Sequence, residues 1–306
     1  MQNFNNILEL IYLKSPLQKK KLEKYLSTQD ELFFESTEIF AQEYSSYLES
    51  QGIPLVFAVD AYLKMVKDML KSQIYFMKTG KYPMESAEQA FVQIYNNENE
   101  MTSFMIGLAI SQFLWSTHYK MYQFLKKNLI NQKGNVRKYL EIGPGHGLFL
   151  KDAYQILGNK VDFVAIDISK TSMDITKSIL KFLVKDNDIK YITMDMLNYD
   201  EIEKFDFITM GEVLEHVDSP NQLLTKFSNL LTDNGSGFIS TCVNCPTIDH
   251  VCHFKCVDEI REMLIINNLV IKDELILPVE DLPIEDIIAN KITINYCAIV
   301  SRKKYN

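Results

Sequence analysis

Three glycines at alternate positions are the residues of this chain whose types and spacing most clearly point to chemistry. Gly143, Gly145 and Gly147 follow a short apolar run, Val136 to Ile142, which contains the acidic Glu141 near its end. Glycine permits positive φ in a tight turn and lets the backbone approach a ligand closely. The pattern predicts a buried strand that ends in a ligand-binding turn and leads into a helix.

The glycine spacing and a second acid narrow the kind of ligand. Dinucleotide sites carry G-x-G-x-x-G, whereas this chain has G-x-G-x-G, which disfavours a dehydrogenase. A second apolar run, Phe163 to Ile166, ends at Asp167, which lies 20 residues beyond Gly147. An acid at the tip of the second strand of a β-α-β unit can accept hydrogen bonds from both ribose hydroxyls. The alternative for Asp167 is a helix N-cap.

Two further segments complete a pattern that carries a family resemblance. A third apolar run, Ile189 to Thr193, ends at Met194-Asp195-Met196. A fourth, Phe205 to Thr209, leads into Met210-Gly-Glu-Val-Leu-Glu-His-Val-Asp-Ser-Pro220. With E-x-G-x-G-x-G, these segments resemble the class I S-adenosylmethionine (SAM) dependent methyltransferases. The fourth is most similar to the methyltransferases of ubiquinone and menaquinone biosynthesis and their small-molecule relatives.

This resemblance implies SAM as the cofactor and a set of residues that hold it. Glu141 would approach the methionine amino group, directly or through water. Asp167 would bind the ribose, and Asp195 and Met196 the adenine. The full cofactor set that the resemblance implies is Glu141, Gly143, Gly145, Gly147, Asp167, Ile168, Asp195, Met196, Gly211 and Glu212.

The same resemblance, which covers about residues 135–303, implies the fold of the second half. It is expected to be α/β, with a Rossmann-like seven-stranded sheet in the order 3-2-1-4-5-7-6 and an antiparallel seventh strand. The residues themselves predict alternating strands and helices from Val136 onward, hence parallel pairing with right-handed crossovers. The last three strands are predicted at Gly237–Val243 after a turn at Asn234-Gly235, at Val270–Leu277 and at Lys291–Arg302.

The first half has a different texture, because it contains no strand-like alternation. We therefore expect an all-α N-terminal domain at residues 1–132, a cap that serves substrate binding or dimerisation, before the SAM-binding domain at 133–306. The boundary is placed near Lys133-Gly-Asn135. Proline and glycine positions and helical periodicity predict helices near 3–14, 16–28, 30–50, 54–79, 84–97 and 100–130.

The methyl acceptor is expected to meet histidines and an aromatic stripe. His216 follows the fourth strand, and His250 and His253 follow the fifth; a neutral imidazole there can take a proton from a hydroxyl. The alternative is that these histidines only support the fold. If the last helix of the first half covers the crevice, the acceptor pocket is lined by Trp115, His118, Tyr119 and Tyr122; plain core packing is the alternative.

The cysteines suggest a zinc site at first sight. Cys242, Cys245, Cys252 and Cys256 lie close in sequence to His250 and His253. Structural zinc sites usually pair two close knuckles across a loop. Here the two cysteine pairs lie too close together, and Cys242 is predicted to lie inside a strand. We therefore expect no metal.

Composition limits the partners and the compartment. The net charge of −8 argues against an extended nucleic-acid surface. The most apolar segment, Met101 to Trp115, falls short of the ~20 residues that a membrane span needs. The start, Met1-Gln-Asn-Phe-Asn-Asn, lacks the features of a signal peptide, and the five cysteines are odd in number. We expect a cytoplasmic protein with reduced thiols.

The sequence thus predicts a SAM-dependent methyltransferase. Its acceptor is expected to be the oxygen or nitrogen, less readily the carbon, of a small and partly apolar or aromatic metabolite. Two alternatives stay open: a protein or RNA methyltransferase that uses the helical half for recognition, and a SAM-binding protein without catalysis. Family analogy adds a homodimer through the helical half.

Overall fold

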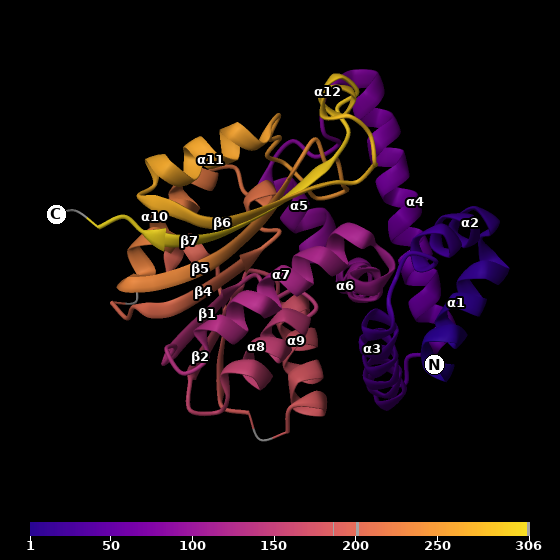
Figure 1. Ribbon diagram of the computed structural model, residues 1–306, viewed down its shortest axis with the longest axis horizontal. Helices are drawn as coiled ribbons and strands as arrows, with labels where there is room; N and C mark the ends of the chain where they lie inside the picture. The colour runs from indigo at the N-terminus through magenta and orange to yellow at the C-terminus, as the bar shows by residue number, and fades with distance from the viewer. Residues whose placement is uncertain (186, 200–201, 305–306) are drawn as a thin grey trace.

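The computed structural model describes residues 1–185, 187–199 and 202–304, and it places a helical half beside a single mixed sheet (Figure 1). Within these residues the sheet has seven strands in the order β3-β2-β1-β4-β5-β7-β6. Strand β7 runs antiparallel to both of its neighbours, and the other pairs are parallel. The predicted sheet order and antiparallel seventh strand are confirmed. The strands are β1 (Lys138–Ile142), β2 (Asp162–Asp167), β3 (Ile189–Thr193), β4 (Phe205–Gly211), β5 (Leu231–Val243), β6 (Leu269–Pro278) and β7 (Ile294–Arg302).

Alternation along the strands sends side chains to two different cores. In β1, Tyr139 joins one hydrophobic cluster, whereas Leu140 and Ile142 join the other, because successive strand residues point to opposite faces. Helices α8 (Leu148–Leu157) and α9 (Lys170–Leu183) pack in the first cluster. Helices α10 (Pro220–Leu230) and α11 (Val257–Ile266) pack in the second. A short helix, α12 (Ile284–Ala289), precedes β7.

The first half is helical, as predicted, but two of its predicted helices are divided. The segment expected as one helix at 100–130 is broken at Trp115, whose backbone is extended (φ −114°, ψ 123°) and whose indole donates a hydrogen bond to the Tyr62 hydroxyl at 3.0 Å. The segment near 84–97 begins as a short α-helix and continues as a π-helical turn, Phe91–Tyr95. The helices are α1 (Gln2–Lys14), α2 (Pro16–Leu26), α3 (Glu31–Ser50), α4 (Leu55–Thr79), α5 (Ala87–Ala90), α6 (Glu98–Leu114) and α7 (Ser116–Gln132).

The turn predicted at Asn234-Gly235 is wrong, because these residues lie inside β5. Pairing with β4 shifts there: Phe205 lies opposite Leu231, whereas Phe207 lies opposite Ser236. The extra residues on β5 are absorbed as an irregularity of the ladder rather than as a hairpin. The strand therefore starts six residues earlier than the sequence predicted.

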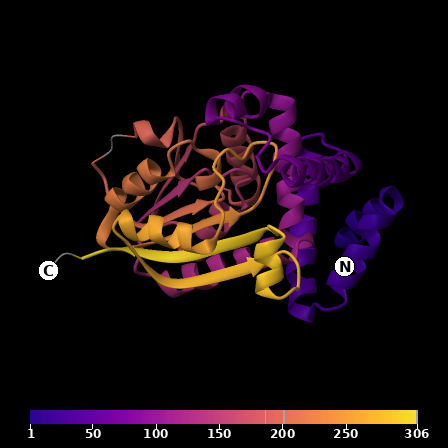
Figure 2. The same ribbon diagram turned by 90° about the horizontal axis from the view of Figure 1, so that it is seen from above.

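The two halves of the chain share a hydrophobic core. The cluster that contains Tyr139 and α8 also contains Phe113 of α6, Leu125 of α7 and Tyr44 of α3. Figures 1 and 2 show helices α1 to α4 at one end of the molecule and α7 against the sheet, with the two termini at opposite ends. Among the described helices, none has both the length and the apolar character needed to cross a bilayer. The helices of the first half thus face the sheet across a continuous apolar interior.

Candidate active site

A cavity of about 490 Å³ lies where β1, β2 and β4 end. This volume falls within the roughly 300–1,000 Å³ of small-molecule sites. In open sheets of this type, ligands bind at the carboxyl ends of the strands, where the strand order reverses. That reversal occurs here between β1 and β4, which are neighbours although two strands lie between them in the sequence. Residues of α4, α5, α6 and α7 form the opposite wall, so the cavity lies between the two halves.

The glycine turn after β1 has room only for glycine. Gly143, Gly145 and Gly147 have φ of +66°, +56° and +75°. A Cβ on Gly143 would lie 2.8 Å from Val213 Cγ2, and one on Gly147 would lie 2.9 Å from Ile179 Cγ2. Gly143 and Gly145 line the cavity, whereas Gly147 lies behind it as the N-cap of α8. The turn therefore brings bare backbone to the cavity wall, as the sequence predicted.

Asp167 lies at the end of β2, is buried, and lines the cavity. One carboxylate oxygen accepts from the Ser169 amide at 2.8 Å, and the other from the Ser172 hydroxyl at 2.6 Å. The N-cap of α9 is Ser169, not Asp167. The alternative role of Asp167 as a helix N-cap is therefore wrong. Burial raises the pKa of Asp167. The Gly145 backbone amide also interacts with this carboxylate, so at least one of its roughly four acceptor sites stays available to a ligand.

Glu141 and the other residues expected to bind the cofactor, apart from Gly147, also line the cavity. Glu141 is buried and accepts a hydrogen bond from the Tyr139 hydroxyl at 2.7 Å, and burial raises its pKa to about 8. One Glu212 carboxylate oxygen is buried without a hydrogen-bond partner among the described residues. Of the ten expected cofactor residues, the cavity lining holds Glu141, Gly143, Gly145, Asp167, Ile168, Asp195, Met196, Gly211 and Glu212.

The aromatic stripe divides between the cavity and the core. Trp115 and His118 line the cavity, with ring centroids 4.7 Å apart. Burial lowers the pKa of His118 to about 4, and its Nδ1 lies 2.9 Å from the Ser111 hydroxyl. Tyr119 and Tyr122 are outside the described lining, and both pack against Phe113. Two of the four expected acceptor-pocket residues are therefore at the cavity.

His216 sits at the cavity in a defined hydrogen-bond network. Its Nδ1 lies 2.8 Å from the Tyr95 hydroxyl, and that hydroxyl donates to an Asp249 carboxylate oxygen at 3.2 Å. Because the tyrosine proton goes to Asp249, Nδ1 is assigned as the donor to the tyrosine oxygen. This tautomer leaves Nε2 with a free lone pair, the state that a proton acceptor needs.

The two later histidines occupy different environments. His250 is buried and lines the cavity, and its Nδ1 lies 2.7 Å from the Cys245 carbonyl oxygen. His253 is absent from the described lining. Its Nε2 lies 2.8 Å from Asn244 Oδ1, and its ring packs against Phe76 and Tyr82. We therefore expect His253 to take no part in proton transfer.

Three residues of the site escaped the sequence reasoning. Tyr95 and Asp249 complete the His216 network, although they come from opposite halves of the chain. Gln112 of α6 lines the cavity, and its buried side-chain oxygen has no partner among the described residues. Of these three, only Gln112 could have been identified from the sequence, because it is a polar residue inside the most apolar segment of the chain.

A family model described as a methyltransferase domain matches residues 140–236, the segment from β1 into β5. This segment supplies the glycine turn, Asp167 and His216. Residues 140–236 therefore belong to a class I methyltransferase domain. Its cofactor is S-adenosylmethionine, for which the positive-φ turn and the fixed acid at the cavity wall are fitting receptors.

Curated relatives of this methyltransferase domain are ubiquinone biosynthesis O-methyltransferases. The protein of Pelagibacter ubique is 36% identical over 104 residues, which cover 34% of this chain and 41% of the relative. The mitochondrial protein of Dictyostelium discoideum is 29% identical over 126 residues, which cover 38% of this chain and 39% of the relative. The chain thus spans less than half the length of either relative.

Solved structures extend the likeness beyond the methyltransferase domain. An O-methyltransferase family protein from Burkholderia thailandensis has a TM-score of 0.56 at 12% identity, covering 82% of this chain and 73% of its own. Mitomycin 7-O-methyltransferase has a TM-score of 0.55 at 9% identity, and the match covers 81% of this chain and 70% of that structure. These identities show the fold alone. The coverage exceeds the share of residues 133–306, so the likeness also includes part of the helical half.

Proposed function

We propose that this protein transfers a methyl group from SAM to a hydroxyl oxygen of a small, partly apolar molecule such as a phenol. The observation that carries the proposal is the shared cavity. It brings the glycine turn and Asp167 together with His216 and with an apolar wall from the helical half. Oxygen is favoured as the acceptor atom because the curated relatives are O-methyltransferases.

The donor would be held by the wall that the strand ends form. Gly143 and Gly145 offer bare backbone at the cavity wall; Asp167 would accept from the ribose, and Asp195 and Met196 would face the adenine. When bound, SAM supplies an electrophilic methyl group that an acceptor oxygen attacks in line with the leaving sulfur. Glu141, buried beside the turn, would meet the methionine ammonium.

The acceptor would bind between His216 and the helical wall. Met105, Leu108 and Trp115 contribute apolar surface from α6 and the break after it, and they exclude water from the cavity. His216 Nε2 would receive the hydroxyl proton while the oxygen–methyl bond forms. Gln112, with its unpartnered oxygen, would accept a hydrogen bond from a polar group of the acceptor.

The enclosure favours a small molecule over a protein or RNA acceptor. The wall contributed by α6 includes the buried Met101, Met105 and Gln112, and the same helix belongs to the shared core. A macromolecular acceptor would have to insert a side chain or base past this wall. The net charge of −8 also opposes an RNA acceptor.

The test is a turnover assay on the full chain, preceded by native mass spectrometry to detect a retained donor. Catechols, simple phenols and primary aromatic amines of matched size serve as acceptors, with S-adenosylhomocysteine release as the readout. We expect release with one of the hydroxyl compounds and a methyl ether as product. Turnover of the amines alone would contradict oxygen transfer. SAM binding without turnover of any acceptor would favour a non-catalytic binding protein.

We also expect SAM binding to release close to one proton per ligand at pH 7, through Glu141. Burial raises its pKa to about 8, so the free protein holds this carboxyl protonated at pH 7. A neighbouring ammonium favours the ionised form and expels that proton. The affinity for SAM should therefore rise as the pH approaches about 8.

Calorimetry in two buffers of different ionisation enthalpy measures this proton. The Glu141→Gln variant should lose the buffer-dependent part of the binding heat, whereas Asp174→Asn, which changes an exposed acid on α9, should retain it. The same proton count in wild type and Glu141→Gln would assign the proton to another group.

A further inference from the structure

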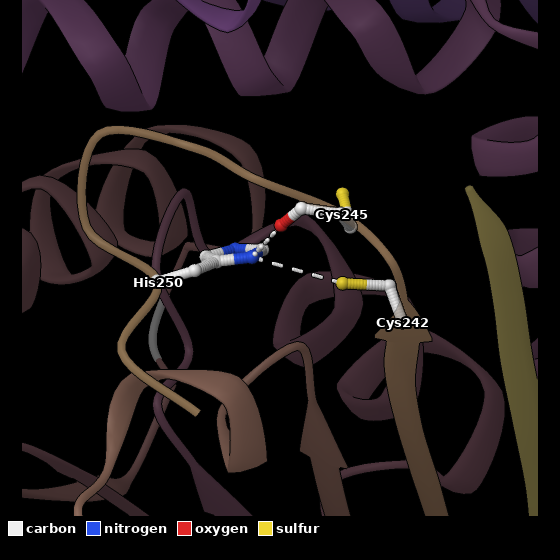
Figure 3. A group of neighbouring side chains, drawn as sticks. All are labelled: Cys242, Cys245 and His250. Carbon is white, nitrogen blue, oxygen red and sulfur yellow. Dashed lines mark hydrogen bonds between the residues drawn. The ribbon is translucent and has the colours of Figure 1, made fainter. Parts of the chain in front are cut away.

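We propose that Cys242, Cys245 and His250 bind a soft divalent metal ion of the zinc class. Cys242 lies near the end of β5, and the other two lie in the loop that follows it (Figure 3). None of the cofactor roles described above uses these side chains. The inference is independent of methyl transfer, because metal binding is measured without turnover.

The geometry of the three side chains suits one ion. All three are buried, and their ligand atoms lie within 4.8 Å of one another. The Cys242 sulfur lies 3.7 Å from His250 Nδ1, and Figure 3 shows the sulfur facing the ring. Zinc–sulfur and zinc–nitrogen bonds of about 2.3 and 2.0 Å place the ligands of a tetrahedral site about 3.5–3.8 Å apart. Ligation through Nδ1 would replace its present hydrogen bond to the Cys245 carbonyl.

A second observation is an unpaired acid beside this group. Glu215 is fully buried, and one of its carboxylate oxygens accepts from the Thr241 hydroxyl at 2.6 Å. The other oxygen is buried without a hydrogen-bond partner in the described part of the chain. Glu215 lies within 4.8 Å of His250 in one group of potential ligands and of Cys242 in another. A buried, unsatisfied carboxylate is costly, and a cation held by the three ligands would compensate its charge from close range.

The ligand types decide the kind of ion. Thiolates and imidazole select zinc and similar soft or borderline metals, whereas magnesium and calcium prefer oxygen. This proposal goes against the expectation of no metal, which rested on the absence of two well-separated cysteine knuckles. In the structure Cys252 is half-buried and Cys256 is exposed. Instead, Cys242 and Cys245 form a single knuckle, and the loop after β5 folds back so that His250 lies beside them.

The test begins with the wild-type full chain, so it does not depend on any variant folding. We expect equimolar zinc by elemental mass spectrometry after dialysis. After zinc removal and addition of Co²⁺, we expect the near-ultraviolet charge-transfer absorption that reports cobalt–thiolate bonds. Cys242→Ser and Cys245→Ser should each weaken this absorption and the metal retention. Cys256→Ser and Cys297→Ser should change neither, and Cys297 matches the ligands in being buried.

Three outcomes would overturn the proposal. The first is a chain that holds no metal and gives no cobalt–thiolate absorption while its thiols titrate as free. The second is a Cys242–Cys245 disulfide in the purified protein, shown by a gain of two hydrogens on reduction. The third is uptake of Mg²⁺ alone, unaffected by both serine variants, which would place the ion on oxygen ligands elsewhere.

Discussion

Asp167→Asn is expected to weaken SAM binding by about 100-fold. Asp167 is fixed at the cavity wall by hydrogen bonds from the Ser169 amide and the Ser172 hydroxyl, and its remaining acceptor capacity would serve the ribose hydroxyls. A hydrogen bond to a charged group contributes about 1.5–3 kcal/mol. Because every 1.4 kcal/mol changes affinity about tenfold, losing the charge and one acceptor gives the stated effect. Titration calorimetry with SAM or S-adenosylhomocysteine measures it.

Asp162→Asn is the matched control for this experiment. Asp162 begins the same strand that Asp167 ends, and it is exposed. We expect this variant to bind SAM as the wild type does. Circular dichroism and the unfolding midpoint of both variants separate lost binding from lost structure, since Asp167 also anchors Ser169 and Ser172. An unchanged affinity in folded Asp167→Asn would exclude a ribose-binding role.

His216→Gln is expected to lower kcat by about 10²–10⁴-fold, the usual contribution of a general base. The network through Tyr95 and Asp249 assigns Nδ1 of His216 as a donor, which leaves Nε2 unprotonated in a residue that lines the cavity. Glutamine keeps a polar side chain of similar size but cannot accept the proton. The affinity for SAM should change by only a few-fold, because the donor residues stay in place. Initial-rate kinetics with the acceptor found in the turnover assay measure the split.

His253→Gln provides the comparison for His216→Gln. Both histidines were candidate bases by sequence, but His253 lies outside the described lining and its Nε2 is bonded to Asn244. We expect His253→Gln to keep wild-type kcat. Tyr95→Phe removes the hydroxyl that orients His216 and should reproduce part of the loss in kcat. Equal kcat for His216→Gln and wild type would remove His216 from the mechanism.

The part of the cavity proposed to hold SAM was predictable because its signals are local. Each of the acids Glu141, Asp167 and Asp195 lies at or beside the end of an apolar run of the sequence, and parallel strands bring such ends to one edge of a sheet. The glycine spacing likewise predicted the positive-φ turn, because few residues other than glycine adopt that backbone conformation. The strand order followed from the family resemblance.

The part proposed to bind the acceptor was not predictable, because it depends on contacts between distant segments. Tyr95 meets His216 across 121 positions of sequence and Asp249 across 154. Periodicity shows which residues of a helix share a face, but not which other element that face meets. Thus only Trp115 and His118 of the predicted stripe line the cavity, whereas Tyr119 and Tyr122 pack in the core, a division that follows the break at Trp115. The cysteine and histidine cluster likewise forms only when the loop after β5 returns.

The hydrophobic cluster common to both halves ties their stabilities together. If the helices separated from the sheet, apolar side chains of both would be exposed to water. The two halves are therefore expected to unfold as one cooperative unit. A ligand bound to the folded state then stabilises the whole unit by mass action. Helices α1 and α3 contribute nothing to the described cavity lining, yet a bound ligand would suppress their opening too. Occupancy of the cavity is in this way communicated to the far end of the molecule through shared stability, without any displacement of atoms.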